Sequence, residues 1–252
     1  MKVIILAAGQ GQRLRPLTDN CPKCMVEYHG KPIIDYILQV IRECSLENII
    51  VIDGYKKDTL ESYLKNENVK FYTNSDFDKT NMVTTLFCAE SELNDDVIIS
   101  YSDIIYKKEV LQKLIDSDAD ISVIVDQNWQ ELWSIRMENP LDDAETMKIG
   151  VNNTIIELGK KATNYNDIQG QYIGLIKISK KMISKIKDFY SGLDKNAIYD
   201  GKDFYNMFMT SFIQMIIERL CPVNAVFING GWIEIDSTSD LENYLHSQKI
   251  FF

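Results

Sequence analysis

The sequence of 252 residues predicts a Rossmann-like three-layer α/β/α sandwich built on a mostly parallel mixed sheet. Short apolar runs alternate with amphipathic helical segments in the first half, which is typical of parallel strands with helices on both faces. The first apolar run leads directly into a loop of small residues. No linker rich in proline, glycine or serine interrupts the chain, so we expect one domain over residues 1–252, with a lid-like insertion at about 126–172.

The expected elements follow in chain order. Short apolar runs predict strands at Val3–Leu6, Asn48–Asp53, Asp96–Ser100 and Ile121–Val125. Apolar residues spaced by 3.6 predict a helix that begins after Pro32, and helical segments are also expected at Asp58–Lys65, Met82–Leu93 and Lys108–Ser117. Residues 126–167 are polar and irregular. Beyond them we expect strands at Gln171–Ile178, Ala225–Ile228 and Trp232–Ile235, and helices at Lys181–Leu193, Phe204–Arg219 and Asp240–His246.

The loop after the first strand has the composition of a phosphate-binding loop. Small residues let backbone N–H groups approach phosphates closely, and nearby cations neutralise the phosphate oxygens. A third glycine is missing, which excludes a dinucleotide fingerprint, and no GK[ST] sequence is present, which excludes a P-loop. The pattern predicts a nucleoside triphosphate site that includes Leu6, Ala7, Ala8, Gly9, Gly11, Arg13 and Lys23.

Carboxylates at two strand ends are candidate metal ligands. Asp103, with Ser102 before it, follows an apolar strand, where ligands of open α/β sheets bind. In the late run GWIEID, alternation places Glu234 and Asp236 on one face of the strand. We expect Asp103 and Asp236 to bind Mg²⁺, for which Mn²⁺ can substitute, with Glu234 as an additional candidate. The structural alternative makes Asp103 a turn residue and Asp236 a helix cap.

Composition narrows the classes of partner and the compartment. The net charge of −10 disfavours nonspecific binding to nucleic acid or to anionic membranes. The first apolar run is too short for a secretion signal, and no stretch is long enough for a membrane span. Five scattered cysteines suit free thiols in a reducing compartment. We therefore expect a cytoplasmic protein that binds neither nucleic acid nor membrane.

The insertion carries a second set of candidate residues. If its first part is helical, Trp129, Trp133 and Arg136 share one face. Tryptophan rings beside the carboxylates of Asp142 and Asp143 can enclose an alkylammonium group, and an arginine can bind a carboxylate or phosphate through two hydrogen bonds. These residues predict an acceptor pocket. The alternative is that both tryptophans form the core of the lid.

The motif LAAGxGxRLxPLT at residues 6–18, with Pro22-Lys23 after it, resembles the nucleotidyltransferase family. The segments DKTNM (78–82), WxxxWxxR (129–136), NPLDDAE (139–145), ELGKK (157–161), QYIG (171–174) and MTSF (209–212) resemble its phosphocholine cytidylyltransferase branch. The resemblance implies the nucleotidyltransferase fold and the transfer of CMP from CTP to a small phosphorylated or phosphonate acceptor, with release of pyrophosphate. It also implies that Arg13 and Lys23 hold phosphates and that Leu6 to Gly9 contact the nucleoside. Asn81 would lie near the cytosine, and Lys160 or Lys161, together with Tyr172, would lie on the acceptor side.

The identity of the acceptor is inferred from the charges of the insertion. An amino-acid acceptor needs a cation for its carboxylate and an acid for its ammonium group, which Arg136 beside Asp142 and Asp143 would provide. We therefore expect phosphoglutamine, as in branch members that act in capsule phosphoramidate synthesis, with phosphocholine and 2-aminoethylphosphonate as alternatives. A sugar-1-phosphate nucleotidylyltransferase is a further alternative. A noncatalytic nucleotide-binding domain is another alternative. Such a domain would be free to lose Lys23 or Asp103, and the presence of both residues weighs against it.

Overall fold

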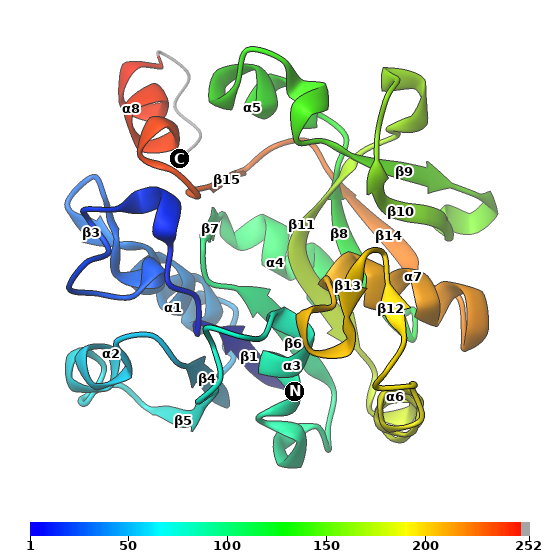
Figure 1. Cartoon of the computed structure of the whole chain (residues 1–252), viewed down its shortest axis with the longest axis horizontal. Coiled ribbons are helices and arrows are strands. Elements are labelled where there is room, and N and C mark those ends of the chain that lie inside the picture. Colours follow the sequence, from blue (N-terminus) through cyan, green and yellow to red (C-terminus); the bar gives the residue numbers. More distant parts are fainter. Residues whose placement is uncertain (248–252) are drawn as a thin grey trace.

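Seven strands form the central sheet of the computed structural model, which describes residues 1–247 (Figure 1). Their order across the sheet is β14-β8-β11-β6-β1-β4-β5. Strand β11 runs antiparallel to β6 and β8, and the other pairings in this sheet are parallel. The predicted mostly parallel mixed sheet is therefore confirmed. The strand bounds are β1 Lys2–Leu6, β4 Ile49–Asp53, β5 Val69–Thr73, β6 Val97–Tyr101, β8 Ile121–Asp126, β11 Gln171–Ile178 and β14 Asn224–Ile228.

Helices cover both faces of the sheet because alternate residues of each strand point to opposite sides. In β1, Val3 and Ile5 belong to a buried cluster with α1, α2 and α4, whereas Ile4 and Leu6 belong to a cluster with α3, α6 and α7. This is the three-layer arrangement that the sequence predicts. The helix bounds are α1 Ile33–Glu43, α2 Lys57–Tyr63, α3 Met82–Phe87, α4 Lys108–Ile115, α6 Lys180–Ser191 and α7 Met209–Arg219.

A short strand pair beside the sheet joins the two predicted metal carboxylates. Strand β7 (Ile104–Tyr106) pairs antiparallel with β15 (Trp232–Glu234). The backbone N–H of Ile235 donates to the carbonyl oxygen of Asp103 at 2.8 Å. This pairing brings Asp236 next to Asp103, although more than a hundred residues separate them in the chain.

The insertion contains more regular structure than the sequence indicates. Residues 126–167, expected to be irregular, form helix α5 (Trp129–Arg136) and the antiparallel pair β9 (Glu145–Ile149) and β10 (Ile155–Lys161). Helix α5 lies against α8 (Thr238–His246) near the end of the described chain (Figure 1). The other short strands are β2 Glu27–Tyr28, β3 Lys31–Pro32, β12 Ile198–Tyr199 and β13 Lys202–Asp203.

Other boundaries differ where a local cap intervenes. The helix expected over Phe204–Arg219 begins at Met209, because Asp203 accepts hydrogen bonds from the backbone N–H groups of Tyr205 and Asn206 and starts a separate 3-10 turn. Strand β5 and the short strand β7 are additional to the predicted ones. Within residues 1–247, no helix is long and apolar enough to cross a membrane.

Candidate active site

The loop after β1 lines a pocket with a volume of about 350 Å³. Gly11 has φ +60°, and a Cβ there would lie 3.0 Å from the Cβ of Lys23, so a larger residue would strain the loop and press against Lys23. The structure brings ten predicted residues together around the pocket, namely Leu6, Ala8, Gly9, Gly11, Arg13, Lys23, Asn81, Ser102, Asp103 and Asp236. Ala7 is the exception. Its side chain is buried in the core, and its N–H donates to Ile52.

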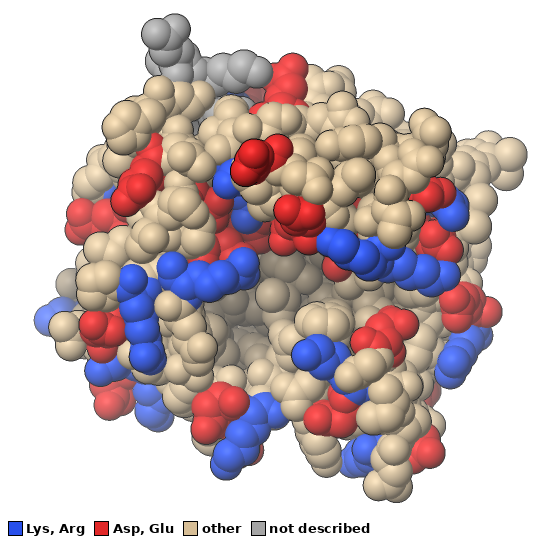
Figure 2. Space-filling view, turned by 45° about the horizontal axis from the view of Figure 1, so that its top comes forward, with Lys and Arg blue, Asp and Glu red and all other residues tan. Residues whose placement is uncertain are grey.

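Cations and carboxylates meet directly at one end of this pocket. The Lys23 Nζ lies 2.7 Å from Asp103 Oδ2 and 2.6 Å from Asp236 Oδ1, and Arg13 also bonds to Asp236. A space-filling view shows a hollow in one face of the molecule that is bordered by basic and acidic side chains (Figure 2). The four charged residues predicted from separate motifs therefore form one cluster.

The charges in this cluster shift one another's pKa values. Burial disfavours the charged form of Lys23, but the carboxylates of Asp103, Asp236 and Glu234 outweigh this cost and raise its pKa. Burial likewise opposes ionisation of Asp236, but Lys23 and Arg13 outweigh it and lower the pKa of that carboxyl. Lys23 and Asp236 are therefore both charged at neutral pH.

The two aspartates are suited to a divalent cation that takes its remaining ligands from the substrate and from water. The Oδ1 atom of Asp103 is buried and has no hydrogen-bond partner among residues 1–247, so it can accept a ligand. In the same part of the chain, no group of three acidic, histidine or cysteine side chains could hold a metal alone. Mg²⁺ commonly uses one or two carboxylates and completes its shell with phosphate and water oxygens. The donor set fits that mode of binding.

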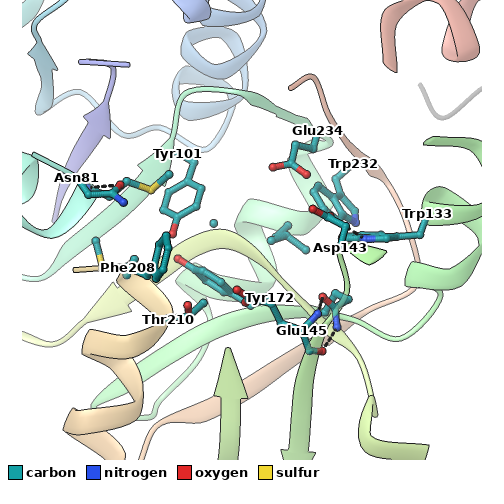
Figure 3. Close-up of a pocket in the computed structure, with 15 residues that line it drawn as sticks. Asn81, Tyr101, Trp133, Asp143, Glu145, Tyr172, Phe208, Thr210, Trp232 and Glu234 are labelled. Atoms are coloured by element: carbon teal, nitrogen blue, oxygen red, sulfur yellow. Dashed lines mark hydrogen bonds between the residues drawn. The ribbon is translucent and has the colours of Figure 1, made fainter. Parts of the chain in front are cut away.

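A second pocket of about 210 Å³ adjoins the first and shares Asn81 and Met82 with it. Tyr101, Tyr172 and Phe208 lie on one side and Trp133 and Trp232 on the other (Figure 3). Carboxylates of three residues also line it, and among the described residues no lysine or arginine does; these three are Asp143, Glu145 and Glu234. Aromatic faces and carboxylates attract a ligand cation.

Close packing affects two features of this second pocket, the pKa of Glu145 and the position of the Tyr101 ring. Burial, with the nearby charge of Asp143, raises the pKa of Glu145 to about 7. The backbone of β11 is irregular between Tyr172 and Ile176, and Gly174 there has φ +91°. A Cβ on Gly174 would lie 2.5 Å from the ring of Tyr101, so this glycine makes room for the ring.

A family model described as a MobA-like NTP transferase domain matches residues 3–188. The chain belongs to this nucleotidyltransferase family. It is 49% identical over 249 residues to a protein named CTP:phosphoglutamine cytidylyltransferase from Campylobacter jejuni, a match that covers 96% of this chain and 98% of that protein.

Solved structures show the same fold as this nucleotidyltransferase. The CTP:phosphocholine cytidylyltransferase of Streptococcus pneumoniae has a TM-score of 0.68 and 21% identity, with 96% of each chain covered. The inositol-1-phosphate CTP transferase of T. maritima has a TM-score of 0.74 and 20% identity, covering 96% of this chain and 94% of that chain. The predicted fold and family are confirmed.

Several predicted acceptor residues of the nucleotidyltransferase lie outside the second pocket. Trp129 is 2% exposed and packs against Trp133 and the ring of Tyr165, so it belongs to the hydrophobic core. Arg136 is buried, its Nε and one Nη pair with Asp240 and Glu234, and it does not line the second pocket. The predictions of direct acceptor contact by Trp129 and Arg136 are therefore corrected.

Three exposed residues of the insertion also stay outside the pocket. Asp142 bonds to the side chain of Asn139 at 2.8 Å. Lys160 pairs with Glu157 at 2.7 Å, and Lys161 donates to the carbonyl oxygens of Leu141 and Asp142. None of the three lines either pocket, because local turn and strand contacts hold them at the surface. By contrast, Trp133, Asp143 and Tyr172, which the sequence analysis also assigned to the acceptor, line the second pocket.

Asn81 stands between the two pockets of the enzyme. Its Oδ1 accepts from the N–H of Met82 at 2.8 Å and caps α3, while its Nδ2 donates to the carbonyl oxygen of Asn206 at 3.4 Å. The side chain therefore fixes the shared wall. Sequence reasoning missed further lining residues, including Phe77, Thr80 and Thr85 of the first pocket and Tyr101, Glu145, Phe208, Thr210 and Trp232 of the second. Strand alternation could have found Trp232, because it shares a face with Glu234.

Proposed function

We propose that this nucleotidyltransferase transfers CMP from CTP to a small phosphorylated acceptor with an ammonium group, with L-glutamine phosphate as its preferred acceptor. The products would be CDP-L-glutamine and pyrophosphate. The observation that carries the proposal is the adjacency of the two pockets, which share Asn81 and Met82 and have the Asp103–Asp236 pair and Glu234 at their walls. The similarity to the Campylobacter jejuni enzyme, at 49% identity, supports both the nucleotide and the acceptor.

The chemistry of the second pocket supports an acceptor cation. Five aromatic residues and three carboxylates line it, and these groups suit an ammonium group better than they suit sugar hydroxyls. The hydroxyl groups of Tyr172 and Thr210 offer directional hydrogen bonds, which an amino acid can use and a trimethylammonium group cannot. Phosphocholine, which has a quaternary ammonium group, and 2-aminoethylphosphonate, which has a primary one, also carry a cation and are the alternative acceptors.

The proposed reaction is an in-line displacement at the α-phosphorus of CTP. An oxygen of the acceptor phosphate forms a bond to that phosphorus, the bond to the oxygen that bridges to the β-phosphorus breaks, and pyrophosphate leaves with the electron pair. The acceptor phosphate is already ionised, so no protein base is required. Arg13 and Lys23 would hold the phosphates of CTP and neutralise the charge that develops on the leaving pyrophosphate.

The aspartate pair would hold the metal. Asp103 and Asp236 offer carboxylate oxygens at the end of the triphosphate pocket, and the buried Asp103 Oδ1 is available as a ligand. Mg²⁺ or Mn²⁺ bound there would screen the charge of the triphosphate. Glu234 lies close by, but its Oε2 is 2.5 Å from an Nη atom of Arg136, so we assign it to the wall of the acceptor pocket.

The cellular setting is part of the same proposal. We propose that the reaction takes place in the cytoplasm, where CTP is made, and that its product serves the modification of a surface polysaccharide with phosphoramidate. The support for this role is the resemblance of segments such as residues 129–145 to the branch members that use phosphoglutamine.

An acceptor panel tests the proposal. Pyrophosphate release is measured with CTP, Mg²⁺ and either L-glutamine phosphate, phosphocholine, 2-aminoethylphosphonate, glucose 1-phosphate or no acceptor. We expect the fastest release with L-glutamine phosphate and a background rate without acceptor. Faster release with glucose 1-phosphate would identify a sugar-activating enzyme instead. No release with any of the acceptors would favour a noncatalytic nucleotide-binding domain.

A further inference from the structure

Arg136 is the centre of a buried ion-pair network beside the two pockets. Its side chain is 3% exposed, its Nε lies 3.1 Å from Asp240 Oδ1, and one Nη lies 2.5 Å from Glu234 Oε2. The arginine belongs to α5 in the insertion, whereas both partners lie about a hundred residues later in the chain. A guanidinium that binds two carboxylates in different directions fixes both of them, because its donors are held in one plane.

The first branch of this network reaches the metal carboxylate. The second oxygen of Asp240, Oδ2, accepts hydrogen bonds from the backbone N–H groups of Asp236 and Ser237, each at 2.9 Å. The backbone N–H of Asp240 in turn donates a hydrogen bond to the hydroxyl oxygen of Ser237, which completes a capping box at the start of α8. Arg136 is thus one hydrogen-bonded residue away from the backbone that presents Asp236.

The second branch reaches the wall of the acceptor pocket. The guanidinium carbon of Arg136 lies 5.2 Å from the ring centroid of Trp133, whose indole N–H donates to Asp143 Oδ2 at 3.1 Å. Trp133, Asp143 and Glu234 all line that pocket, while Arg136 lines neither pocket. One buried cation therefore contacts the groups that shape the acceptor pocket and, through Asp240, the group proposed to bind metal.

We infer that Arg136 is a positioning residue that couples the geometry of the acceptor pocket to that of the metal carboxylate Asp236. The inference rests on the proposed function of the two pockets. Arg136 acts through Asp240 on Asp236 and directly on Glu234 and Trp133. Displacement of its guanidinium disturbs the acceptor pocket and the metal site together, whereas the nucleotide loop around Arg13 is left in place.

Two substitutions separate the branches. Arg136→Lys keeps the charge, but an ammonium group cannot bond to both carboxylates in the geometry of the fork. Asp240→Asn keeps the shape and an oxygen acceptor for the backbone N–H of Asp236, but it removes the charge that pairs with Arg136. Arg42→Lys is the matched control, because Arg42 pairs with Glu67 on the exposed side of α1 and lines neither pocket.

Metal binding is measured without turnover. Mn²⁺ is titrated into each folded enzyme with CTP and no acceptor, and the relaxation rate of water protons reports Mn²⁺ held on the protein. Loss of an outer partner of a metal ligand weakens metal binding about tenfold or more, and we expect this loss in Arg136→Lys and Asp240→Asn. Arg42→Lys should bind Mn²⁺ like the wild type.

Steady-state kinetics then distinguish the two branches. Arg136→Lys should raise the acceptor KM about tenfold and change the CTP KM less than twofold, by analogy with outer-shell substitutions. Asp240→Asn should leave the acceptor KM close to the wild-type value, since Trp133 and Asp143 keep their contacts. A purely structural role of Arg136 would lower the melting temperature without this split between the two KM values.

Two kinds of result would overturn the inference, one in Mn²⁺ affinity and one in the acceptor KM. Wild-type Mn²⁺ affinity in Asp240→Asn, or in folded Arg136→Lys, would show that the network does not position Asp236. An unchanged acceptor KM in folded Arg136→Lys would show that the acceptor branch is not coupled. If Arg136→Lys does not fold, Asp240→Asn decides alone. If the wild type uses none of the acceptors, the proposed function fails, while Mn²⁺ binding still tests the inference.

Discussion

Replacing Lys23 with methionine removes the central cation of the site and keeps most of its side-chain volume. In the structure, the Lys23 ammonium lies within hydrogen-bond distance of Asp103 and Asp236, and the three side chains are only 11–15% exposed. In the Lys23→Met protein, the two aspartates repel each other without their shared ammonium, while Arg13 still pairs with Asp236 and Arg136 still attracts its charge. The substitution should therefore affect both turnover and the response of stability to metal.

The expected magnitudes follow from the geometry. At a charge separation of about 4 Å and an effective dielectric constant of about 20, each Lys23–aspartate attraction is about 4 kcal/mol before the cost of desolvation is subtracted. Loss of a preorganised cation beside a reacting triphosphate costs about 2–4 kcal/mol of transition-state stabilisation. Because about 1.4 kcal/mol corresponds to a factor of ten, kcat/KM should fall about 30- to 1000-fold.

Pyrophosphate release and thermal unfolding measure the two effects. Lys23→Met should lower the melting temperature of the metal-free protein, and Mg²⁺ should raise it more than in the wild type, because the vacated position is flanked by two carboxylates that have lost their shared ammonium. Lys31→Met is the control, since Lys31 lines neither pocket. Turnover close to wild type in Lys23→Met, or an unchanged response to Mg²⁺, would refute this role of Lys23.

Three further predictions concern the metal, the pocket wall and the pocket acid. EDTA should abolish turnover and Mg²⁺ or Mn²⁺ should restore it, while Asp236→Asn should need more metal for half-maximal rate; activity in EDTA would contradict the metal assignment. Gly174→Ala should displace the Tyr101 ring and raise the acceptor KM more than the CTP KM. Equal increases in the two KM values would show that Gly174 serves only the folding of the protein. The pKa of Glu145 is raised from 4.5 to about 7, so the native state binds more protons than the unfolded state in that window, and stability of the free enzyme falls as pH rises through it. In the Glu145→Gln protein, the free energy of unfolding should fall by about 1–3 kcal/mol less than in the wild type between pH 5 and pH 8. An identical pH profile of thermal unfolding in the two proteins would contradict the prediction.

The nucleotide pocket could be predicted from the sequence because its signals are local. A strand followed by small residues places Gly9 and Gly11 at the edge of the sheet, and Arg13 follows within two residues. Asp103 and Asp236 each lie two residues after the end of a short strand, β6 and β15 respectively, and polar groups gather where strands end. The position of each aspartate near a strand end could be predicted without knowledge of how distant segments pack. That the two aspartates share one pocket depends on the long-range pairing of β7 with β15.

The acceptor pocket could be predicted only in part, because its walls depend on long-range packing. Helical periodicity correctly grouped Trp133 and Arg136 on one face of α5, but it could not show which of them meets the pocket. That choice is made by Glu234 and Asp240, which lie about a hundred residues further along the chain and pair with the guanidinium of Arg136. Trp129 was misassigned for the same reason, since Tyr165 covers its ring.

The destination of the α-phosphorus tests the central claim most directly. CTP carrying ³²P at either the α- or the γ-position is incubated with Mg²⁺, the enzyme and L-glutamine phosphate, and the products are separated. We predict that the α-label appears in the adduct with the acceptor, and that the γ-label appears in pyrophosphate in equal amount. Transfer of the γ-label to the acceptor, or release of pyrophosphate with the α-label left in free CMP, would contradict transfer of CMP between the two pockets.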